Sequence, residues 1–159
     1  MEAIIREFYT SQAGFRIAAM NPELLISVVS LETECGLSSR GVESYLTMIS
    51  DPQSILLVAI EDAGQIIGVF SGVVVIDELQ IDNLAVSDRW RRQGIGKTLL
   101  RTALSNAKRM GACTATLEVR LSNSPARALY EKEGFTEDAV RTSYYTAPVD
   151  DALLLSREI

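Results

Sequence analysis

The stretch that decides the fold is Arg91-Arg92-Gln93-Gly94-Ile95-Gly96-Lys97-Thr98, which joins a predicted strand to a predicted helix. Its two glycines let the backbone come close to a ligand. The N–H groups of the first helical turn lack partners within the helix, and with the positive end of the helix dipole they favour an anion. Arg92 and Lys97 add positive charge. The segment predicts a phosphate-binding turn, although an ordinary helix start with solvated arginines has the same pattern.

Two familiar phosphate loops do not fit these residues. A Walker A loop needs a glycine five residues before the glycine of Gly-Lys-Thr, and that position is Arg91. A dinucleotide-binding fingerprint needs a glycine three residues after Gly96, and that position is Leu99. The remaining pattern is Arg-x-x-Gly-x-Gly at the start of a helix, which does not by itself identify the ligand.

Strand and helix patterns alternate on both sides of this loop. Before it, we predict strands over Phe15–Ala19, Ser54–Glu61, Gln65–Ile76 and Glu78–Val86, and helices that start at Asn21 and at about Ser39, the second ending near Ile49. After it, we predict a helix with an apolar stripe from Ile95 to Met110, then strand Thr114–Arg120, helix Ser124–Glu133, and strands near Thr136–Tyr145 and Ala152–Glu158. Residues 1–13 are a leader of uncertain structure. This order predicts a mixed α/β fold, one sheet with helices on both faces, in a single domain over residues 1–159.

The composition narrows the class of function. The chain has 159 residues and a net charge of -6, which disfavours nonspecific binding to nucleic acid or anionic lipid. An acidic surface suits a cationic substrate, or it serves solubility alone. The chain has no histidine, so we expect no metal site, and a general base would be a carboxylate, lysine, tyrosine or water. Because we find no signal-peptide pattern and no run of about 18 apolar residues, we expect a cytoplasmic protein.

Further segments give a family resemblance. Asn83-Leu84-Ala85-Val86 together with the glycine loop resembles the central motif of the GNAT N-acetyltransferases, and residues 117–123 with 128–135 resemble the next motif. With residues 140–145, these blocks are most similar to the RimI-type ribosomal-protein alanine N-acetyltransferases. The resemblance is clear over about residues 78–159, and Phe15–Glu34 also looks like the family's first strand and helix. It implies a GNAT-like acyl-CoA N-acyltransferase fold with a mostly antiparallel sheet, and acetyl-CoA as cosubstrate.

The resemblance also implies roles for individual residues. Glu118 matches the family's proton acceptor and Tyr130 its proton donor. The positions that match acetyl-CoA contacts are Leu84, Ala85 and Val86 on the strand, Arg92, Gln93, Gly94, Ile95, Gly96 and Lys97 in the loop, and Asn123. From the pattern alone, Glu118 also fits an exposed strand charge, and Tyr130 fits a packing residue on an apolar helical stripe. Asp82 is an alternative base.

The implied reaction transfers acetyl to an amine by direct attack. An α-amine with a pKa near 8 costs about 1.4 kcal/mol to deprotonate at pH 7, and a lysine near 10.4 costs about 4.6 kcal/mol. We therefore expect the N-terminus of a protein, such as a ribosomal protein, as acceptor, with no direct nucleic-acid or membrane partner and a monomer or homodimer. A small-molecule amine is an alternative acceptor, because Glu34–Ser39 lacks the Pro-Trp pair that family members usually carry there. A non-catalytic acyl-CoA-binding module is a further alternative.

Overall fold

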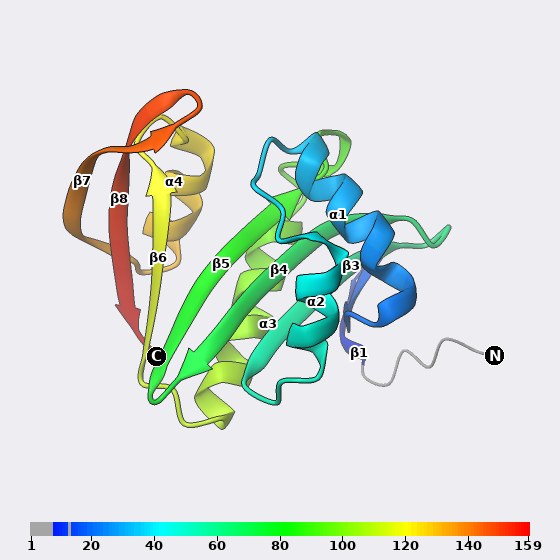
Figure 1. The fold of residues 1–159 in the computed structure, drawn as a ribbon. Helices are drawn as coiled ribbons and strands as arrows, with labels where there is room; N and C mark the ends of the chain where they lie inside the picture. Colours follow the sequence, from blue (N-terminus) through cyan, green and yellow to red (C-terminus); the bar gives the residue numbers. More distant parts are fainter. Residues whose placement is uncertain (1–7, 13) are drawn as a thin grey trace.

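The computed structural model describes residues 8–12 and 14–159. Over these ranges it forms one eight-stranded sheet in the order β1-β2-β3-β4-β5-β6-β8-β7 (Figure 1). The strands are β1 (Phe8–Gln12), β2 (Phe15–Ala19), β3 (Ser54–Glu61), β4 (Ile66–Val75), β5 (Glu78–Val86), β6 (Thr114–Arg120), β7 (Thr136–Thr146) and β8 (Val149–Glu158). The helices are η1 (Pro22–Leu24), α1 (Leu25–Glu34), α2 (Gly41–Ile49), η2 (Asp88–Trp90), α3 (Ile95–Arg109) and α4 (Ser124–Lys132).

Only one of the neighbouring strand pairs in this described sheet is parallel, the pair of β5 and β6. The sheet is therefore mixed and mostly antiparallel, as predicted. Strands β3 and β4 lie inside the sheet, and most of their residues are buried. A strand covered on both faces reads as a continuous apolar run rather than an alternating one, which is why these two segments are so rich in Ile, Leu and Val.

Helices cover both faces of the sheet (Figure 1). On one face, α3 buries a helical stripe against β3, β4 and β5, and its members are Ile95, Leu99, Leu100, Ala103, Leu104 and Ala107. On the other face, α1 and α2 pack over Val58, Ile60 and Val69. Each face of the sheet thus has its own apolar cluster beneath helices, and the predicted arrangement of helices on both faces is confirmed.

Three differences from the prediction stand out, whereas the ends of β4, α4, β7 and β8 shift by only one to three residues. Part of the leader forms β1, which pairs antiparallel with β2, whereas residues 1–7 and 13 lie outside the described residues. The second helix begins at Gly41 rather than near Ser39, because Gly41 has a left-handed backbone (φ 82°) that a helix cannot pass through. Met110 does not belong to the buried stripe of α3, since the helix ends at Arg109 and the Met110 side chain is exposed.

Candidate active site

The site begins where the parallel pair of strands separates. Four residue pairs join β5 to β6, from Glu78 opposite Thr114 to Ile81 opposite Leu117. Beyond that point β5 and β6 continue without pairing with each other, and Figure 1 shows them diverging. A β-bulge lies at the same place, since Asp82 has no partner in β4 between Ile81 and Asn83. Bulges bend a strand and increase its twist, so the bulge at Asp82 accounts for the end of the pairing.

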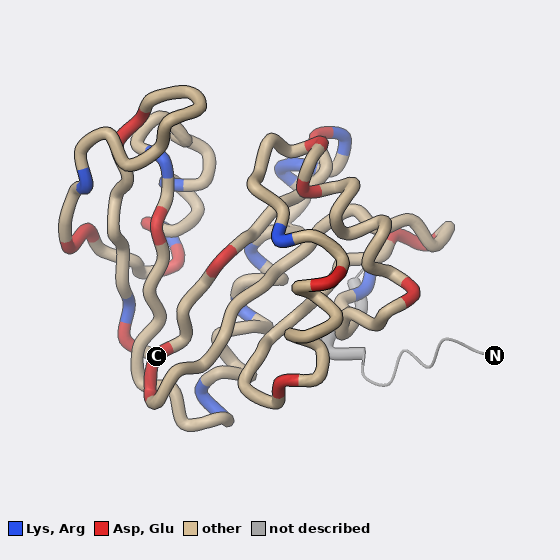
Figure 2. The backbone as a smooth tube through the Cα atoms, in the orientation of Figure 1, with Lys and Arg blue, Asp and Glu red and all other residues tan. Residues whose placement is uncertain are grey.

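A cleft of about 700 Å³ occupies this opening. Four of the predicted site residues line it, namely Leu84 on β5, Glu118 on β6, and Asn123 and Tyr130 at α4. The other walls come from Gly36–Ser38 after α1, from Glu78, Gln80, Asp82 and Asn83 on β5, from Thr116 and Arg120 on β6, and from Asp138, Arg141, Tyr144 and Tyr145 on β7. Figure 2 shows acidic positions on both diverging strands and basic positions on β6 and β7. The cleft therefore presents charges of both signs.

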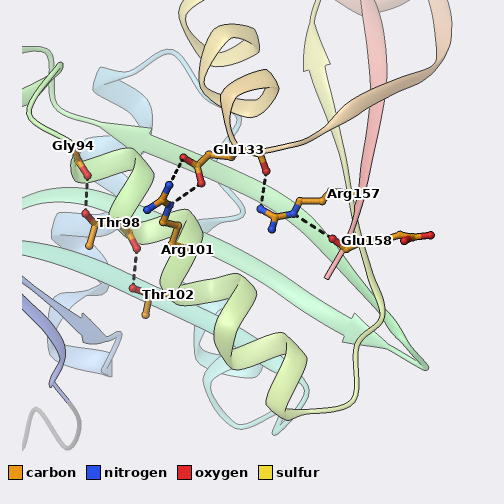
Figure 3. Close-up of polar contacts among 7 residues, drawn as sticks. All are labelled: Gly94, Thr98, Arg101, Thr102, Glu133, Arg157 and Glu158. Carbon is orange, nitrogen blue, oxygen red and sulfur yellow. Dashed lines mark hydrogen bonds and ion pairs between the residues drawn. The ribbon is translucent and has the colours of Figure 1, made fainter.

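The predicted phosphate-binding turn lies at the start of α3. Gly94 is the N-cap residue in a left-handed conformation (φ 81°), and Arg92 is also left-handed (φ 62°). No side chain caps the helix, and the first helical bond runs from the Thr98 N–H to the Gly94 oxygen at 3.0 Å. The Thr98 hydroxyl also donates to that oxygen, at 2.7 Å (Figure 3). The first-turn amides thus remain available to an anion, helped by the helix dipole.

Gly96 connects this turn to the cleft. A Cβ atom added at Gly96 would lie 3.4 Å from Leu129 Cδ2 on α4 and 3.6 Å from Val86 Cγ2 at the end of β5. The turn of Arg92–Lys97 therefore lies beside the diverging end of β5, although its side chains do not line the cleft itself. Ala85 is buried in the cluster under α1 and α2, so only its backbone can contribute to binding on the cleft side. A ligand that reaches from the turn into the cleft passes between β5 and α4.

Glu118 lies on the cleft face of β6, alternating with buried Leu117 and Val119. Its side chain is one-third exposed, and Oε1 lies 3.3 Å from Nη1 of Arg141. Tyr144 on β7 also lines the cleft beside this carboxylate, and its interaction with Glu118 raises the pKa of Tyr144. A carboxylate held by two partners at the edge of a cleft can accept a proton from a bound amine, directly or through water.

Tyr130 is a buried residue that also lines the cleft, so it fits both roles considered for it from the sequence. Its ring packs edge-to-face on Phe135 with a centroid separation of 5.5 Å. Burial raises the pKa of Tyr130, which keeps the phenol protonated and able to donate. This protonated hydroxyl is available to a departing thiolate, whose ordinary pKa is about 8.5.

The helix that carries Tyr130 is fixed at its C-terminal end. The buried carboxylate of Glu133 accepts from Arg101 Nε at 2.8 Å and from Arg101 Nη2 at 3.2 Å, which ties α4 to α3 (Figure 3). Arg157 Nη1 on β8 donates to the Glu133 carbonyl at 2.6 Å. At the other end, the Asn123 side chain caps the helix by accepting from the Ala126 N–H at 3.3 Å. Asn123 thus has a structural role in addition to its place in the cleft.

Several contacts around the cleft were not anticipated from the sequence. Asp82, weighed as an alternative base, is paired with Arg40 at 2.9 Å. A buried carboxylate, Glu32, accepts from Tyr45 at 2.8 Å, from Ser39 at 3.2 Å and from Asn83. These contacts hold the segment between α1 and α2 against β5. The sequence does contain one indication, because Glu32 is a charged residue within an otherwise apolar helical stripe. Its partners, however, lie on other elements and could not be predicted.

Comparison with known proteins identifies the family. The model of the acetyltransferase (GNAT) family matches residues 25–135. The chain belongs to the GNAT acetyltransferases. Membership confirms the predicted family and the predicted enzyme class, an N-acetyltransferase, and it implies acetyl-CoA as cosubstrate. Within the described residues there is no group of three His, Cys, Asp or Glu side chains suited to a metal ion, and no helix long and apolar enough to cross a membrane.

Individual GNAT enzymes are similar over much of the chain. A putative ribosomal protein bS18-alanine N-acetyltransferase of Bacillus subtilis is 38% identical over 111 residues, covering 70% of this chain and 73% of that protein. The corresponding Escherichia coli K12 enzyme is 41% identical over 88 residues, covering 54% of this chain and 60% of its own length. A crystal structure of the E. coli ribosomal-protein-S18-alanine N-acetyltransferase superposes with a TM-score of 0.81 at 27% identity, over 91% of this chain and 94% of the other. These relatives agree with the predicted RimI-type branch.

Proposed function

We propose that this GNAT enzyme acetylates the N-terminal α-amine of a protein, with a ribosomal protein as the acceptor. The observation that carries the proposal is the single cleft that brings Glu118 and Tyr130 together beside the uncapped first turn of α3. The relatives named for acetylating the N-terminal alanine of bS18 support the choice of acceptor. Because ribosomal proteins are synthesised in the cytoplasm, the proposal places the reaction there.

The proposed assignment of the acetyl-CoA contacts follows the geometry. The amides of Gly94–Lys97 would bind the diphosphate, with Arg92 and Lys97 adding positive charge. Between this turn and the acetyl group, the backbone of Leu84, Ala85 and Val86 would contact the cosubstrate along the side of β5 that no longer pairs with β6. The Asn123 side chain lies across the same opening. Each of these groups therefore lies on one path from α3 to Glu118.

The proposed chemistry is direct transfer. The acceptor α-amine loses a proton to Glu118, at a cost of about 1.4 kcal/mol at pH 7 for a pKa near 8. The neutral amine nitrogen then forms a bond to the thioester carbonyl carbon, its second proton leaves to solvent, and the carbon–sulfur bond breaks. Tyr130 gives its proton to the departing thiolate. The products are an acetylated N-terminus and free coenzyme A, with the protons of the two side chains exchanged afterwards through solvent.

A small-molecule amine is the second candidate acceptor, and one observation favours it. The segment between α1 and α2 lines the cleft with Gly36, Leu37 and Ser38, where family members usually carry a Pro-Trp pair. This segment shapes the acceptor side, so its change in size and polarity bears directly on which amine is accepted.

The test is to incubate the protein with acetyl-CoA and each of a panel of peptides and free amines, and to measure the rate at which free thiol is released. We expect short peptides with a free N-terminal alanine or another small residue to support turnover, and free amino acids or polyamines to support much less. Glu118→Gln is expected to lower turnover about 100-fold or more, whereas Glu131→Gln, an exposed change on α4, should not. Turnover on free amines alone would favour the second candidate, and binding of coenzyme A without turnover on any acceptor would contradict catalysis.

A further inference from the structure

Two residues that interact with Glu118 come from β7, a strand that is not adjacent to β6 in the sheet. Arg141 and Tyr144 both belong to β7, and both meet the Glu118 carboxylate of β6. Strand β8 lies between β6 and β7, so the two strands are about 10 Å apart. Leu154 is the β8 residue opposite Glu118, and Ala139 is the β7 residue opposite Leu154. Only a long side chain from β7 can reach across this distance.

An irregularity in β7 brings these side chains to the cleft. The pairing of β7 with β8 is regular up to Arg141, opposite Ala152, and resumes at Tyr145, opposite Asp150. Three residues of β7 thus lie against the single Asp151 of β8. Ser143, in the middle, has a left-handed backbone (φ 51°), and its N–H donates to Asp151 Oδ1 at 2.7 Å. A non-glycine residue in that conformation costs about 1–3 kcal/mol, and such strain is often found at functional sites.

The other charged groups around Glu118 have partners of their own. On β5, Glu78 accepts from Thr116 at 2.6 Å and Asp82 is paired with Arg40. On β6, Arg120 donates to the carbonyls of Pro148 and Ala147, at 2.9 and 3.3 Å.

The remaining groups that face the cleft lie on α4 and β7. They are Tyr130, buried on α4, and Asp138 and Tyr145 on β7. The guanidinium of Arg120 lies 4.1 Å from the centre of the Tyr145 ring, and that of Arg141 lies 5.6 Å from the centre of the Tyr144 ring. Arg141 is therefore the cation that pairs with Glu118, and Tyr144 packs beside it.

We propose that Arg141 and Tyr144 are positioning residues that hold the Glu118 carboxylate in the orientation from which it accepts the amine proton. This inference rests on the proposed role of Glu118 as base. A glutamate on an exposed strand face has several rotamers, and a proton acceptor works only within hydrogen-bond reach of the amine. The ion pair with Arg141, with Tyr144 packed beside it, favours one of them. Arg141 acts through a single nitrogen, so a lysine ammonium can replace it, whereas a neutral side chain cannot.

The kinetic test compares Arg141→Gln, Arg141→Lys and Tyr144→Phe in the whole chain, with Arg89→Gln as an exposed control outside the cleft. The assay is thiol release with acetyl-CoA and an alanine-initiated peptide. We expect Arg141→Gln to lower kcat about 10- to 100-fold, the loss typical of a misplaced catalytic group, with peptide KM and coenzyme A affinity close to wild type. Arg141→Lys should recover most of the loss, and Tyr144→Phe should have a smaller effect in the same direction.

A second readout needs no turnover. Because the Glu118 contact raises the pKa of Tyr144, Glu118→Gln should lower the pKa of Tyr144 toward its ordinary value, measured by NMR of ring-labelled tyrosine. An unchanged titration of Tyr144 would contradict the contact. A rise in peptide KM at unchanged kcat in Arg141→Gln would overturn positioning and make Arg141 an acceptor-binding residue. If the wild-type chain acetylates no peptide but the Tyr144 titration moves as expected, the proposed function fails while the contact stands.

Discussion

Replacing Gly96 by alanine is expected to weaken coenzyme A binding while leaving the fold intact. The added methyl group would lie 3.4 Å from Leu129 Cδ2 and 3.6 Å from Val86 Cγ2, which is ordinary van der Waals contact. The protein can therefore accommodate the methyl group without moving. The same methyl group, however, narrows the gap between the end of β5 and α4, through which the cosubstrate passes in the proposed binding mode.

The two effects have different expected magnitudes. Alanine is favoured over glycine within a helix by about 1 kcal/mol, so the free energy of unfolding should stay unchanged or rise by up to that amount. If the methyl group prevents one first-turn amide from reaching the diphosphate, the loss is that of a hydrogen bond to a charged group, about 1.5–3 kcal/mol. This corresponds to a Kd about 10- to 150-fold weaker.

The assays are isothermal titration calorimetry with coenzyme A and urea unfolding. Gly68→Ala is the matched control, because a Cβ atom there would lie 3.0 Å from Leu99 Cδ1, 3.1 Å from Ile95 Cγ2 and 3.2 Å from Ala59 Cβ. This overpacking should cost about 1–3 kcal/mol of stability. Gly96→Ala should thus lose affinity and keep stability, whereas Gly68→Ala should lose stability. An unchanged Kd in a stable Gly96→Ala protein would refute the place given to the diphosphate.

Three further changes test other parts of the molecule. Tyr130→Phe should lower kcat about 100-fold or more with little change in coenzyme A affinity, and equal turnover would remove Tyr130 from the mechanism. Glu32→Ala leaves the hydroxyl of Tyr45 and the amide of Asn83 without their acceptor; urea unfolding should show a loss of at least about 2 kcal/mol, and a loss no larger than that of the exposed Glu34→Ala would contradict the network. The hydrogen bond from the Ser122 hydroxyl lowers the pKa of Asp150, so the stabilising effect of this bond is complete above about pH 4 and is lost as pH falls further. Thermal unfolding from pH 2.5 to 7 should therefore show a smaller acid dependence for Asp150→Asn than for wild type. Identical profiles of the two proteins would argue against this role of Asp150.

Much of the fold follows from local patterns in the sequence. The boundaries of β2, β3, β5 and β6 are those predicted, because β2, β3 and β6 are short apolar or β-branched runs and β5 begins with alternating polar and apolar residues. Strand β1 lies at the edge of the sheet, and no alternation in the leader distinguishes it from a loop. The bulge at Asp82 was also not predictable, because it is defined by the register of β4 against β5 and not by residue type.

The residues of the site also fall into those predicted from local sequence and those that depend on how the strands assemble. The role of Glu118 was predicted because its segment resembles a family motif, and the turn of Gly94–Lys97 was predicted from its glycines; both stay predictions. Arg141 and Tyr144 were not predicted, since their meeting with Glu118 depends on β8 inserting between β6 and β7 and on the irregular register near Ser143. The contacts of Glu32 likewise join three elements whose positions only the folded chain determines.

The short parallel seam between β5 and β6 has a mechanical consequence. Four residue pairs are all that link the strand ladder of the N-terminal part to that of β6, β8 and β7, so the sheet has a short lateral connection next to the proposed catalytic groups. Coenzyme A bound in the cleft would contact both β5 and β6 and so reduce the motion of one strand relative to the other. We therefore expect amides of β6 and β8 to exchange with deuterium more slowly when coenzyme A is bound, even where they do not touch it.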